Sequence, residues 1–353
     1  MIDLAVFDWR ARDENAQSTS LAILLPVIVC AATLLFAAIT VFAARIDAWP
    51  LLSTFDCAIV SLLCVLSFNF LDVAWLAKSR ADNPLSKIKE RLVERLPLMI
   101  LPAFVLPTFL IGYTASKCAI PFLVGYTWDH FWANVDRAIF GDDAWRLALG
   151  AIGTSTIHVW TWVYSVGWGT AFLVVANAVA WYGKRELVGV YFTASLATWL
   201  IGGCFMAYAL SAAGPVFAPM FDPSLASGFR PLQDFLNTSL GYGPIGFSQH
   251  FLAVAVHQHV ASKGGGISAM PSMHIASVSI FVLAARRTRW VYPAILFWLM
   301  IFVLSAYFGF HYWIDGIVAA IVSAICWFGS EILYSRLLGH SNRFIGQPQL
   351  LTS

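Results

Sequence analysis

Charged residues are scarce in this chain of 353 residues: Asp, Glu, Lys and Arg make up 11% of it, whereas hydrophobic residues make up 59%. A soluble globular domain carries about 25% charged residues, so this composition excludes an ordinary soluble protein. The formal net charge of +2 provides no strongly basic surface, and we expect no nucleic-acid partner. The sequence instead predicts a protein that places most of its residues in a membrane.

Cysteine pairs and metal-ligand clusters are also missing. None of the six cysteines belongs to a Cys-x-x-Cys pair or to a cysteine–histidine set, so we expect no disulfide. His257 and His259 form a His-x-His pair near His250, which leaves a zinc site open as an alternative. No third ligand is specified, however, and no acidic cluster accompanies them. We therefore expect no metal and no cofactor.

Eight apolar runs predict membrane helices on their length and hydrophobicity. They cover residues 20–44, 54–77, 96–115, 157–182, 187–211, 271–285, 291–310 and 313–335. The fold class that follows is all-α: a polytopic membrane protein with about eight transmembrane helices. Between the third and fourth runs, residues 128–141 have the pattern of an amphipathic helix whose aromatic residues suit the lipid headgroup zone.

These runs divide the chain into three parts. Residues 1–95 comprise a polar N-terminal segment, two membrane helices and a strongly basic loop at 78–95. Residues 96–335 hold the other six helices, and residues 336–353 form a polar tail. No short apolar core with a small-residue cleavage site follows residues 1–19, so we expect no removable signal peptide.

Two short stretches carry reactive groups where a loop passes into an apolar run. The first is Ser268-Ala-Met-Pro-Ser-Met-His-Ile-Ala-Ser277. Pro271 suits the opening turn of a helix there, and Ser268 or Ser272 can cap the free backbone amides. Together with the helix dipole, those amides favour an anion beside His274.

The second stretch is Phe310-His-Tyr-Trp-Ile-Asp315. His311 and Asp315 are four residues apart, so on a helix they share a face and the carboxylate can reach the imidazole. A carboxylate behind a histidine fixes its tautomer and makes the other ring nitrogen a better nucleophile or base. The combination indicates phosphoryl chemistry: two histidines, one carboxylate and a helix N-terminus that favours an anion.

In this order, Pro271-Ser-Met-His274 and His311-Tyr-Trp-Ile-Asp315 resemble the second and third signature motifs of the type-2 phosphatidic acid phosphatase/haloperoxidase superfamily. The form Ser-Ala-Met-Pro-Ser-Met-His, followed by His-Tyr-x-x-Asp, is similar to the branch that contains inositol phosphorylceramide synthases and many bacterial relatives. The resemblance implies a six-helix phosphatase-like core over residues 96–335. It also implies a membrane enzyme that hydrolyses a lipid phosphate, or that moves a phospho-alcohol headgroup such as phosphoinositol from a phospholipid to another lipid.

For such a reaction we predict His311 as the nucleophile that forms a phosphohistidine, with Asp315 stabilising the developing imidazolium. His274 serves as general acid toward the leaving oxygen and then as general base for the acceptor, which is water or an alcohol. The alternative is a transporter or scaffold in which the His/Asp pair is a proton relay or a packing element. The sequence shows no inverted repeat with broken helices, which argues against a transporter.

The residues that usually hold phosphate in this superfamily are missing. The third motif normally has an arginine six residues before its histidine, where this chain has Ser305. The usual first motif, a lysine followed by Arg-Pro, is absent, and a small-residue stretch at 212–217 stands in its position. We therefore predict Ser272, Lys263 and Arg230 as substrate-binding residues. Further candidates are Lys117, Arg137 and the backbone amides of Gly264, Gly265 and Gly266, with ordinary surface charge as the alternative for each cation.

The placement of basic residues predicts the orientation in the membrane. Of the 21 Lys and Arg residues, all but six fall on one set of alternate connections. The six are Arg45, Lys117, Arg137, Arg146, Arg230 and Lys263. The richer set is expected on the cytoplasmic side, which puts both termini inside and His274 and His311 on the outer face. The resemblance to bacterial relatives implies a bacterial inner membrane, and the sequence sets no oligomeric state.

Overall fold

The structure, a computed structural model, describes residues 16–48, 56–78, 83–240, 243–261 and 265–338. Within these residues it is almost entirely helical, and the only strand-like pairing there is an isolated bridge between Asp47 and Val260. The predicted all-α class is therefore confirmed. The expected polar N-terminal segment and the C-terminal tail fall almost wholly outside the described residues.

All eight predicted apolar runs are helical, and six helices of the described chain are long and apolar enough to cross a membrane. In chain order, the long runs are α1 (Ala16–Ala44), α2 (Asp56–Lys78), α3 (Pro84–Ile100) continued by the π-helix η3 (Leu101–Val105) and α4 (Leu106–Leu123), α7 (Ile157–Trp162) continued by the π-helix η4 (Val163–Gly167) and α8 (Trp168–Tyr182), α9 (Arg185–Leu200) continued by the π-helix η5 (Ile201–Met206) and α10 (Ala207–Ala209), and α16 (Trp313–Leu337). Two shorter apolar helices complete the set, α14 (Met273–Ala285) and α15 (Val291–Tyr307).

The basic segment 78–95 is mostly helix, whereas the sequence predicted a loop. From Pro84 onward it forms α3, which runs on through η3 into α4. Proline is tolerated at the start of a helix because its missing N–H would have no intrahelical partner there. Arg95 is buried and donates a 2.6 Å hydrogen bond to the carbonyl oxygen of Gly183, so a basic side chain fixes α3 to the end of α8.

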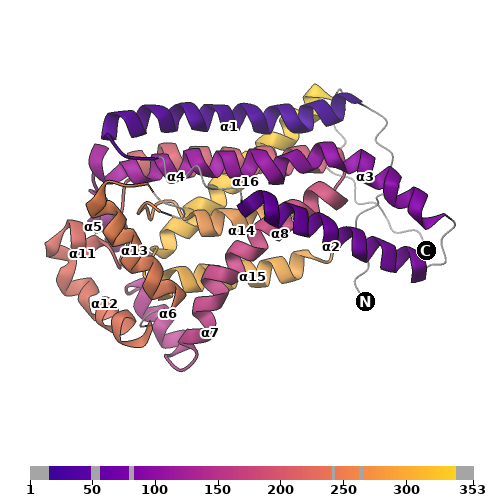
Figure 1. Cartoon of the computed structure of the whole chain (residues 1–353). Coiled ribbons are helices and arrows are strands. Elements are labelled where there is room, and N and C mark those ends of the chain that lie inside the picture. The colour runs from indigo at the N-terminus through magenta and orange to yellow at the C-terminus, as the bar shows by residue number, and fades with distance from the viewer. Residues whose placement is uncertain (1–15, 49–55, 79–82, 241–242, 262–264, 339–353) are drawn as a thin grey trace.

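The remaining helices gather at one end of the bundle (Figure 1). They are α5 (Asp129–Phe140), α6 (Ala144–Ile152), α11 (Ala218–Phe221), the 3-10 turn η6 (Pro223–Leu225), α12 (Ala226–Leu240) and α13 (Pro244–Gln258). At the opposite end, Tyr334 in α16 donates a 3.0 Å hydrogen bond to the carbonyl oxygen of Leu21 in α1. The start of α1 and the end of α16 therefore lie together, away from the short helices.

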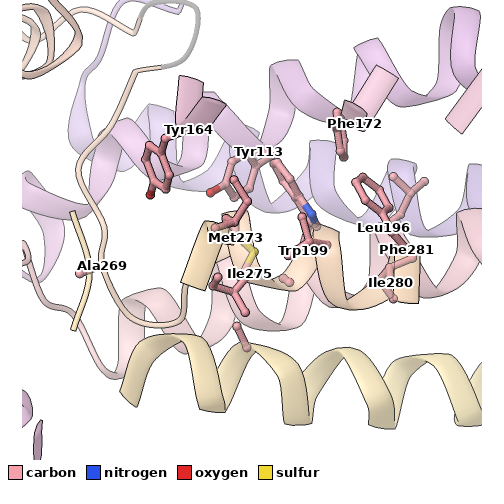
Figure 2. Packing of buried hydrophobic residues seen from close by; sticks show 14 of the residues in the cluster. Tyr113, Tyr164, Phe172, Leu196, Trp199, Ala269, Met273, Ile275, Ile280 and Phe281 are labelled. Atoms are coloured by element: carbon pink, nitrogen blue, oxygen red, sulfur yellow. The ribbon is translucent and has the colours of Figure 1, made fainter. Parts of the chain in front are cut away.

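Helix α14 lies at the centre of the bundle, in contact with α9, α15 and α16. It is apolar all round, as expected for a helix that is buried on every side. Figure 2 shows its first residue, Met273, close to Tyr113 of α4 and Trp199 of α9. With 13 residues, α14 rises only about 20 Å, less than the roughly 30 Å of the apolar layer. The segment 265–272 that precedes it is mostly buried.

Candidate active site

Three loops from distant parts of the chain meet where α14 and α16 begin. They comprise residues 210–217 after α10, residues 265–272 before α14, and residues 308–312 between α15 and α16. Backbone hydrogen bonds join the three loops to one another. Ala269 donates to the carbonyl oxygen of Ala212 at 2.8 Å, and Val216 donates to that of Gly309 at 2.9 Å. The loops therefore form one framework at this end of the bundle.

Two glycines permit this close approach. Gly214 and Gly309 have φ angles of 87° and 69°, in the left-handed region that other residues adopt only with strain. A Cβ on Gly214 would lie 2.4 Å from the carbonyl oxygen of Phe310, and a Cβ on Gly309 would lie 2.6 Å from Leu232. Gly214, in the stretch 212–217, and Gly309 are therefore needed for the packing beside the site.

His311 lies in the loop just before α16 and is only 5% exposed. Its Nδ1 atom is 2.7 Å from the carbonyl oxygen of Ala269. A carbonyl oxygen only accepts hydrogen bonds, so Nδ1 carries the proton and Nε2 presents its lone pair. Burial lowers the pKa of His311 to about 3; the charge of Lys117 adds to this effect and the hydrogen bond to Ala269 opposes it. The imidazole is therefore neutral at neutral pH, as a nitrogen nucleophile must be.

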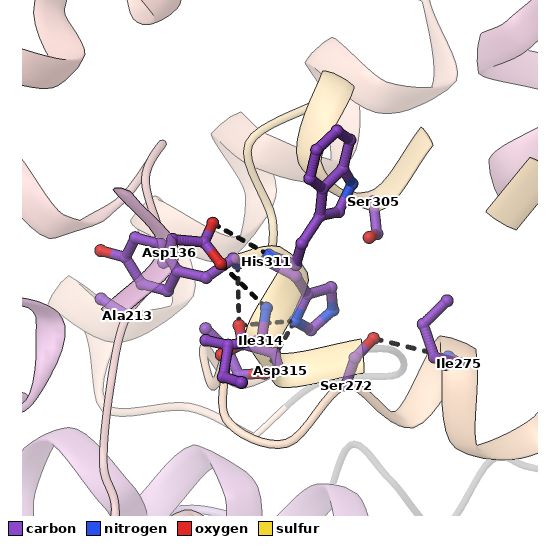
Figure 3. A network of polar contacts seen from close by, with 12 residues as sticks. Asp136, Ala213, Ser272, Ile275, Ser305, His311, Ile314 and Asp315 are labelled. Atoms are coloured by element: carbon purple, nitrogen blue, oxygen red, sulfur yellow. Dashed lines mark hydrogen bonds and ion pairs between the residues drawn. The ribbon is translucent and has the colours of Figure 1, made fainter. Parts of the chain in front are cut away.

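Asp315 is fully buried in the first turn of α16, and its Oδ2 atom lies 3.5 Å from Nδ1 of His311 (Figure 3). The same oxygen accepts a 2.9 Å hydrogen bond from the N–H of Tyr312. Its other oxygen, Oδ1, has no hydrogen-bond partner among the described residues. The predicted carboxylate is therefore beside the histidine, but the expectation that it fixes the tautomer is corrected: the carbonyl of Ala269 does so. A carboxylate charge at this distance still favours an imidazolium when one forms.

His274, in the first turn of α14, lies beside His311, with 5.9 Å between their ring centroids. Its ring is held between Tyr164, stacked at 4.7 Å, and Trp168, tilted at 4.2 Å. Trp168 also donates through Nε1 to the carbonyl oxygen of His274 at 3.3 Å. Tyr164 belongs to η4, and such π-helical turns are frequent at functional sites. The structure thus brings the two predicted histidines into one site.

Ser272 is the N-cap of α14, as predicted, and its Oγ atom accepts a 3.4 Å hydrogen bond from the N–H of Ile275 (Figure 3). Its own N–H donates to the carbonyl oxygen of Asp315 at 3.2 Å, which joins the two motifs. Pro271, expected in the opening turn, lies before the cap and outside the helix. The reason is that the N-cap residue keeps a non-helical backbone, so α14 begins only at Met273.

Helix α5 contributes a buried carboxylate to the start of α16. Asp136 is 1% exposed and accepts hydrogen bonds from the N–H groups of Trp313 at 3.1 Å and Ile314 at 2.9 Å (Figure 3). These amides belong to the first turn of α16 and have no partner within the helix, so Asp136 caps it from a different element. Burial raises the pKa of Asp136 to about 7, although the two hydrogen bonds act in the opposite direction.

A second carboxylate of α5, two turns earlier on the same face, joins two of the loops. Asp129 accepts hydrogen bonds from the N–H groups of Ala213 at 2.8 Å and Gly214 at 2.9 Å, and from the hydroxyl of Tyr312 at 3.0 Å. The amphipathic helix predicted over residues 128–141 is thus present, but both of these acidic groups face the protein. Their spacing of two helical turns is the one signal in the sequence that could have indicated a shared buried face.

A family model of the PAP2 superfamily matches residues 132–328, which is more than half of the chain and includes both histidine motifs. The chain belongs to the PAP2 superfamily. The superfamily predicted from the two motifs is therefore confirmed, as is the class of enzyme, a phosphatase or phosphotransferase. No curated protein and no solved structure matches the chain significantly.

In this PAP2 protein, the residue at the usual arginine position and the candidate Arg137 both form hydrogen bonds with other groups of the protein. Ser305, where an arginine is usual, is buried in α15 and donates a 2.8 Å hydrogen bond to the carbonyl oxygen of Phe302. Arg137 of α5 is held by Asp143, with 2.6 Å between Nε and Oδ1. Ser305 carries no charge, and the charge of Arg137 is already paired with that of Asp143.

The other candidates differ in their position. Arg230 is exposed on α12, and no hydrogen bond or ion pair joins it to the histidines in the part of the chain that the structure describes. Lys263 and Gly264 lie outside the described residues. Lys117, half-buried near the end of α4, acts electrostatically on both His274 and His311. It is the candidate cation that the structure brings to the site.

The three histidines of the possible zinc site lie on α13 or at its end. His250, His257 and His259 are exposed, and the ring of His259 stacks on Phe122 with 4.1 Å between centroids. Over the described ranges, no group of three or more His, Cys, Asp or Glu side chains is arranged to hold a metal ion. The geometry gives the zinc alternative no support.

Proposed function

We propose that this PAP2 superfamily protein is a lipid phosphotransferase or lipid phosphate phosphatase that works through a phosphohistidine on His311. The observation that carries the proposal is the 2.7 Å hydrogen bond from Nδ1 of His311 to the carbonyl of Ala269. This bond leaves the Nε2 lone pair of a buried, neutral imidazole available for attack on phosphorus. His274 lies close enough, at 5.9 Å between ring centroids, to exchange protons with the oxygens of the same phosphate.

The proposed reaction has two steps. In the first, Nε2 of His311 bonds to phosphorus while the bond to the leaving oxygen breaks, and protonated His274 gives that oxygen its proton. In the second, the oxygen of water or an alcohol bonds to phosphorus, the bond to Nε2 breaks, and His274 takes the proton of the acceptor. Asp315, with Oδ2 3.5 Å from Nδ1, offsets the positive charge that His311 carries in between.

The proposed substrate is a lipid phosphate or a phospholipid, because the histidines lie at one end of an apolar helical bundle. The likeness of the motifs to inositol phosphorylceramide synthases favours a phospho-alcohol headgroup, such as phosphoinositol, as the group transferred. Ser305 in place of the usual arginine agrees with that branch, which also lacks it. Ser272 is proposed to contact the phosphate through its hydroxyl proton, and Lys263 stays a candidate; the exposed position of Arg230 disfavours that residue.

We also propose that the site faces outside and that both termini are cytoplasmic. The basis is the charge asymmetry of the connections, since positively charged loops remain on the cytoplasmic side. The hydrogen bond between Tyr334 and Leu21 agrees with one part of this proposal, that both termini lie on the same side, because it places the start of α1 and the end of α16 together at the end opposite the site. In a bacterial inner membrane, the site would then face the periplasm.

Trapping of the phosphoenzyme tests the proposed reaction. The full-length protein in detergent would be mixed with radiolabelled phosphatidic acid, quenched in alkali, which preserves phosphohistidine, and digested for peptide mapping. We expect the label on the peptide that contains His311 and no label in His311→Ala. Label on another residue, or full turnover by His311→Ala, would contradict the mechanism. A transporter or scaffold would give neither a phosphoenzyme nor released phosphate.

A further inference from the structure

Lys117 is a half-buried cation with no ion-pair partner among the residues that the structure describes. It lies near the C-terminal end of α4, and within the described ranges no hydrogen bond or ion pair involves its side chain. Removing an ammonium group from water is costly unless an opposite charge or hydrogen-bond acceptors replace the lost hydration. A cation in this position therefore has unused capacity to bind an anion.

The stem of Lys117 packs against the loop that precedes α14. Gly266 in that loop has a φ of 81°, and a Cβ there would lie 2.8 Å from Cγ of Lys117. Three residues further on, Ala269 accepts the hydrogen bond from Nδ1 of His311. Three residues of extended chain span at most about 11 Å, so the lysine and the nucleophile lie within a short distance of each other.

The face of α4 that carries Lys117 also points toward α14. Tyr113 is one turn earlier on the same face, since residues four apart lie above one another on a helix. Figure 2 shows Tyr113 beside Met273, and both would contact a Cβ placed on Gly203, at 2.5 Å and 3.0 Å. Lys117 therefore lies one turn beyond Tyr113, at the end of the bundle where His274 follows Met273.

We propose that Lys117 binds the phosphoryl oxygens of the substrate, in place of the arginine that is missing at Ser305. The assignment rests on the proposed function. Charge spreads over the equatorial oxygens of a transferring phosphoryl group, and a nearby cation stabilises it. A lysine binds phosphate as a point charge and needs no planar geometry, so it can do so from α4 although the usual arginine comes from the helix before the nucleophile.

The position of Lys117 has a second consequence for His311. Its positive charge contributes to the lowered pKa of His311, so the same cation that attracts phosphate also disfavours protonation of the nucleophile. The other titratable groups that face His311 are His274 on α14 and Asp315 on α16. The charge of Lys117 acts on His274 as well as on His311, so a substitution at Lys117 changes the electrostatic surroundings of both histidines.

Binding of inorganic phosphate to the full-length protein in detergent, followed by calorimetry, tests the proposal. Lys117→Met keeps the length and apolar stem of the side chain but removes the charge, and Lys117→Arg keeps the charge. We expect phosphate affinity to fall by about tenfold or more in Lys117→Met and to stay close to wild type in Lys117→Arg. Lys89→Met, at an exposed position on α3, is the matched control and should bind phosphate as the wild type does.

The pH dependence of turnover provides a second readout that a purely structural role would not move. Without the positive charge, His311 protonates more easily, so the acidic limb of kcat/KM should shift to higher pH in Lys117→Met and remain in place in Lys117→Arg. Equal phosphate affinity in Lys117→Met and wild type would overturn the assignment.

The outcomes also separate this proposal from the reaction mechanism. Phosphate binding that depends on Lys117, in a protein that forms no phosphoenzyme, would leave the binding site in place and reject the covalent step. A phosphoenzyme on His311 with phosphate affinity unaffected by Lys117→Met would reject Lys117 alone. Failure of the wild type to bind phosphate at all would reject Lys117 as a phosphate-binding residue.

Discussion

Nδ1 of His311 donates a 2.7 Å hydrogen bond to the backbone carbonyl of Ala269. A peptide carbonyl does not titrate, so the tautomer of this histidine is set by the main chain and does not depend on the ionisation of a side chain. Two roles that one carboxylate often combines are therefore separated here. The carbonyl orients the ring, and Asp315, whose Oδ2 atom lies 3.5 Å from Nδ1, is proposed to offset the positive charge when an imidazolium forms.

Substitution of the two histidines should impair different steps of the proposed reaction. His311→Ala should abolish the phosphoenzyme, because it removes the attacking nitrogen. His274→Ala should slow both formation and breakdown of the phosphoenzyme by about a hundredfold or more, because one imidazole gives a proton in the first step and takes one in the second. Rapid-quench measurement of both steps checks this, with the exposed His257→Ala as control. A double variant should lose little more than the worse single variant, since the residues act as a unit.

Asp315→Asn should lower kcat by less than a substitution that changes the tautomer of the histidine would. In a serine protease triad, the equivalent change costs about 10⁴-fold because the histidine adopts the wrong tautomer. Here Ala269 keeps the proton on Nδ1, so we expect about a hundredfold loss in kcat, from the missing charge alone. Steady-state kinetics on a lipid phosphate measure it. A loss as large as that of His311→Ala would show that the carboxylate does orient the ring.

Asp136→Ala should destabilise the start of α16. It leaves the buried N–H groups of Trp313 and Ile314 without an acceptor, at a cost of about 1–3 kcal/mol for each unsatisfied group. Thermal unfolding in detergent should show a lower Tm for Asp136→Ala than for Asp136→Asn, which keeps one acceptor oxygen. Equal Tm values for the two variants would contradict the capping role.

The same aspartate should make stability depend on pH. Its pKa is raised to about 7 in the folded protein, above the ordinary aspartate value of 3.8, so the folded state holds the proton more tightly between these values. Its contribution to stability is therefore complete below the unfolded pKa and is lost as pH rises toward 7. Relative to the non-titrating Asp136→Asn, the wild type should lose stability from pH 4 to pH 7, as measured by unfolding at each pH.

Activity should survive strong chelators. The proposed reaction uses a covalent bond to His311 and needs no metal-bound water as nucleophile. Phosphate release measured before and after incubation with a chelator such as EDTA checks this expectation. Loss of activity that zinc restores would instead favour a site at His250, His257 and His259.

Reporter tags should map residues 184 and 287 to the cytoplasm and residue 240 to the outer side. The reason is the excess of Lys and Arg on one set of connections, which remains on the cytoplasmic side. Accessibility of single introduced cysteines to a membrane-impermeant reagent in intact cells measures the same sides independently. Residues 240 and 287 on one side would reject the arrangement of eight spans.

The sequence by itself determined the eight helical runs, because a segment in lipid must satisfy its backbone hydrogen bonds internally, and apolar length then translates directly into helix. It also predicted that His274, His311 and Asp315 form one site, because their spacing and residue types are local, and the structure brings these three residues together. The basic segment that forms α3 was missed because a high density of charge opposes burial in lipid but does not oppose helix formation.

Only the tertiary structure decided which distant groups surround these histidines. Ala269 contributes a backbone carbonyl, which has no signature in a sequence. Asp136 reaches an amide of Trp313 that is 177 residues away, and Lys117 comes from a helix outside the residues matched by the family model. Each of these contacts depends on how buried helices pack against one another, and packing at such separations leaves no periodic or local pattern in the chain.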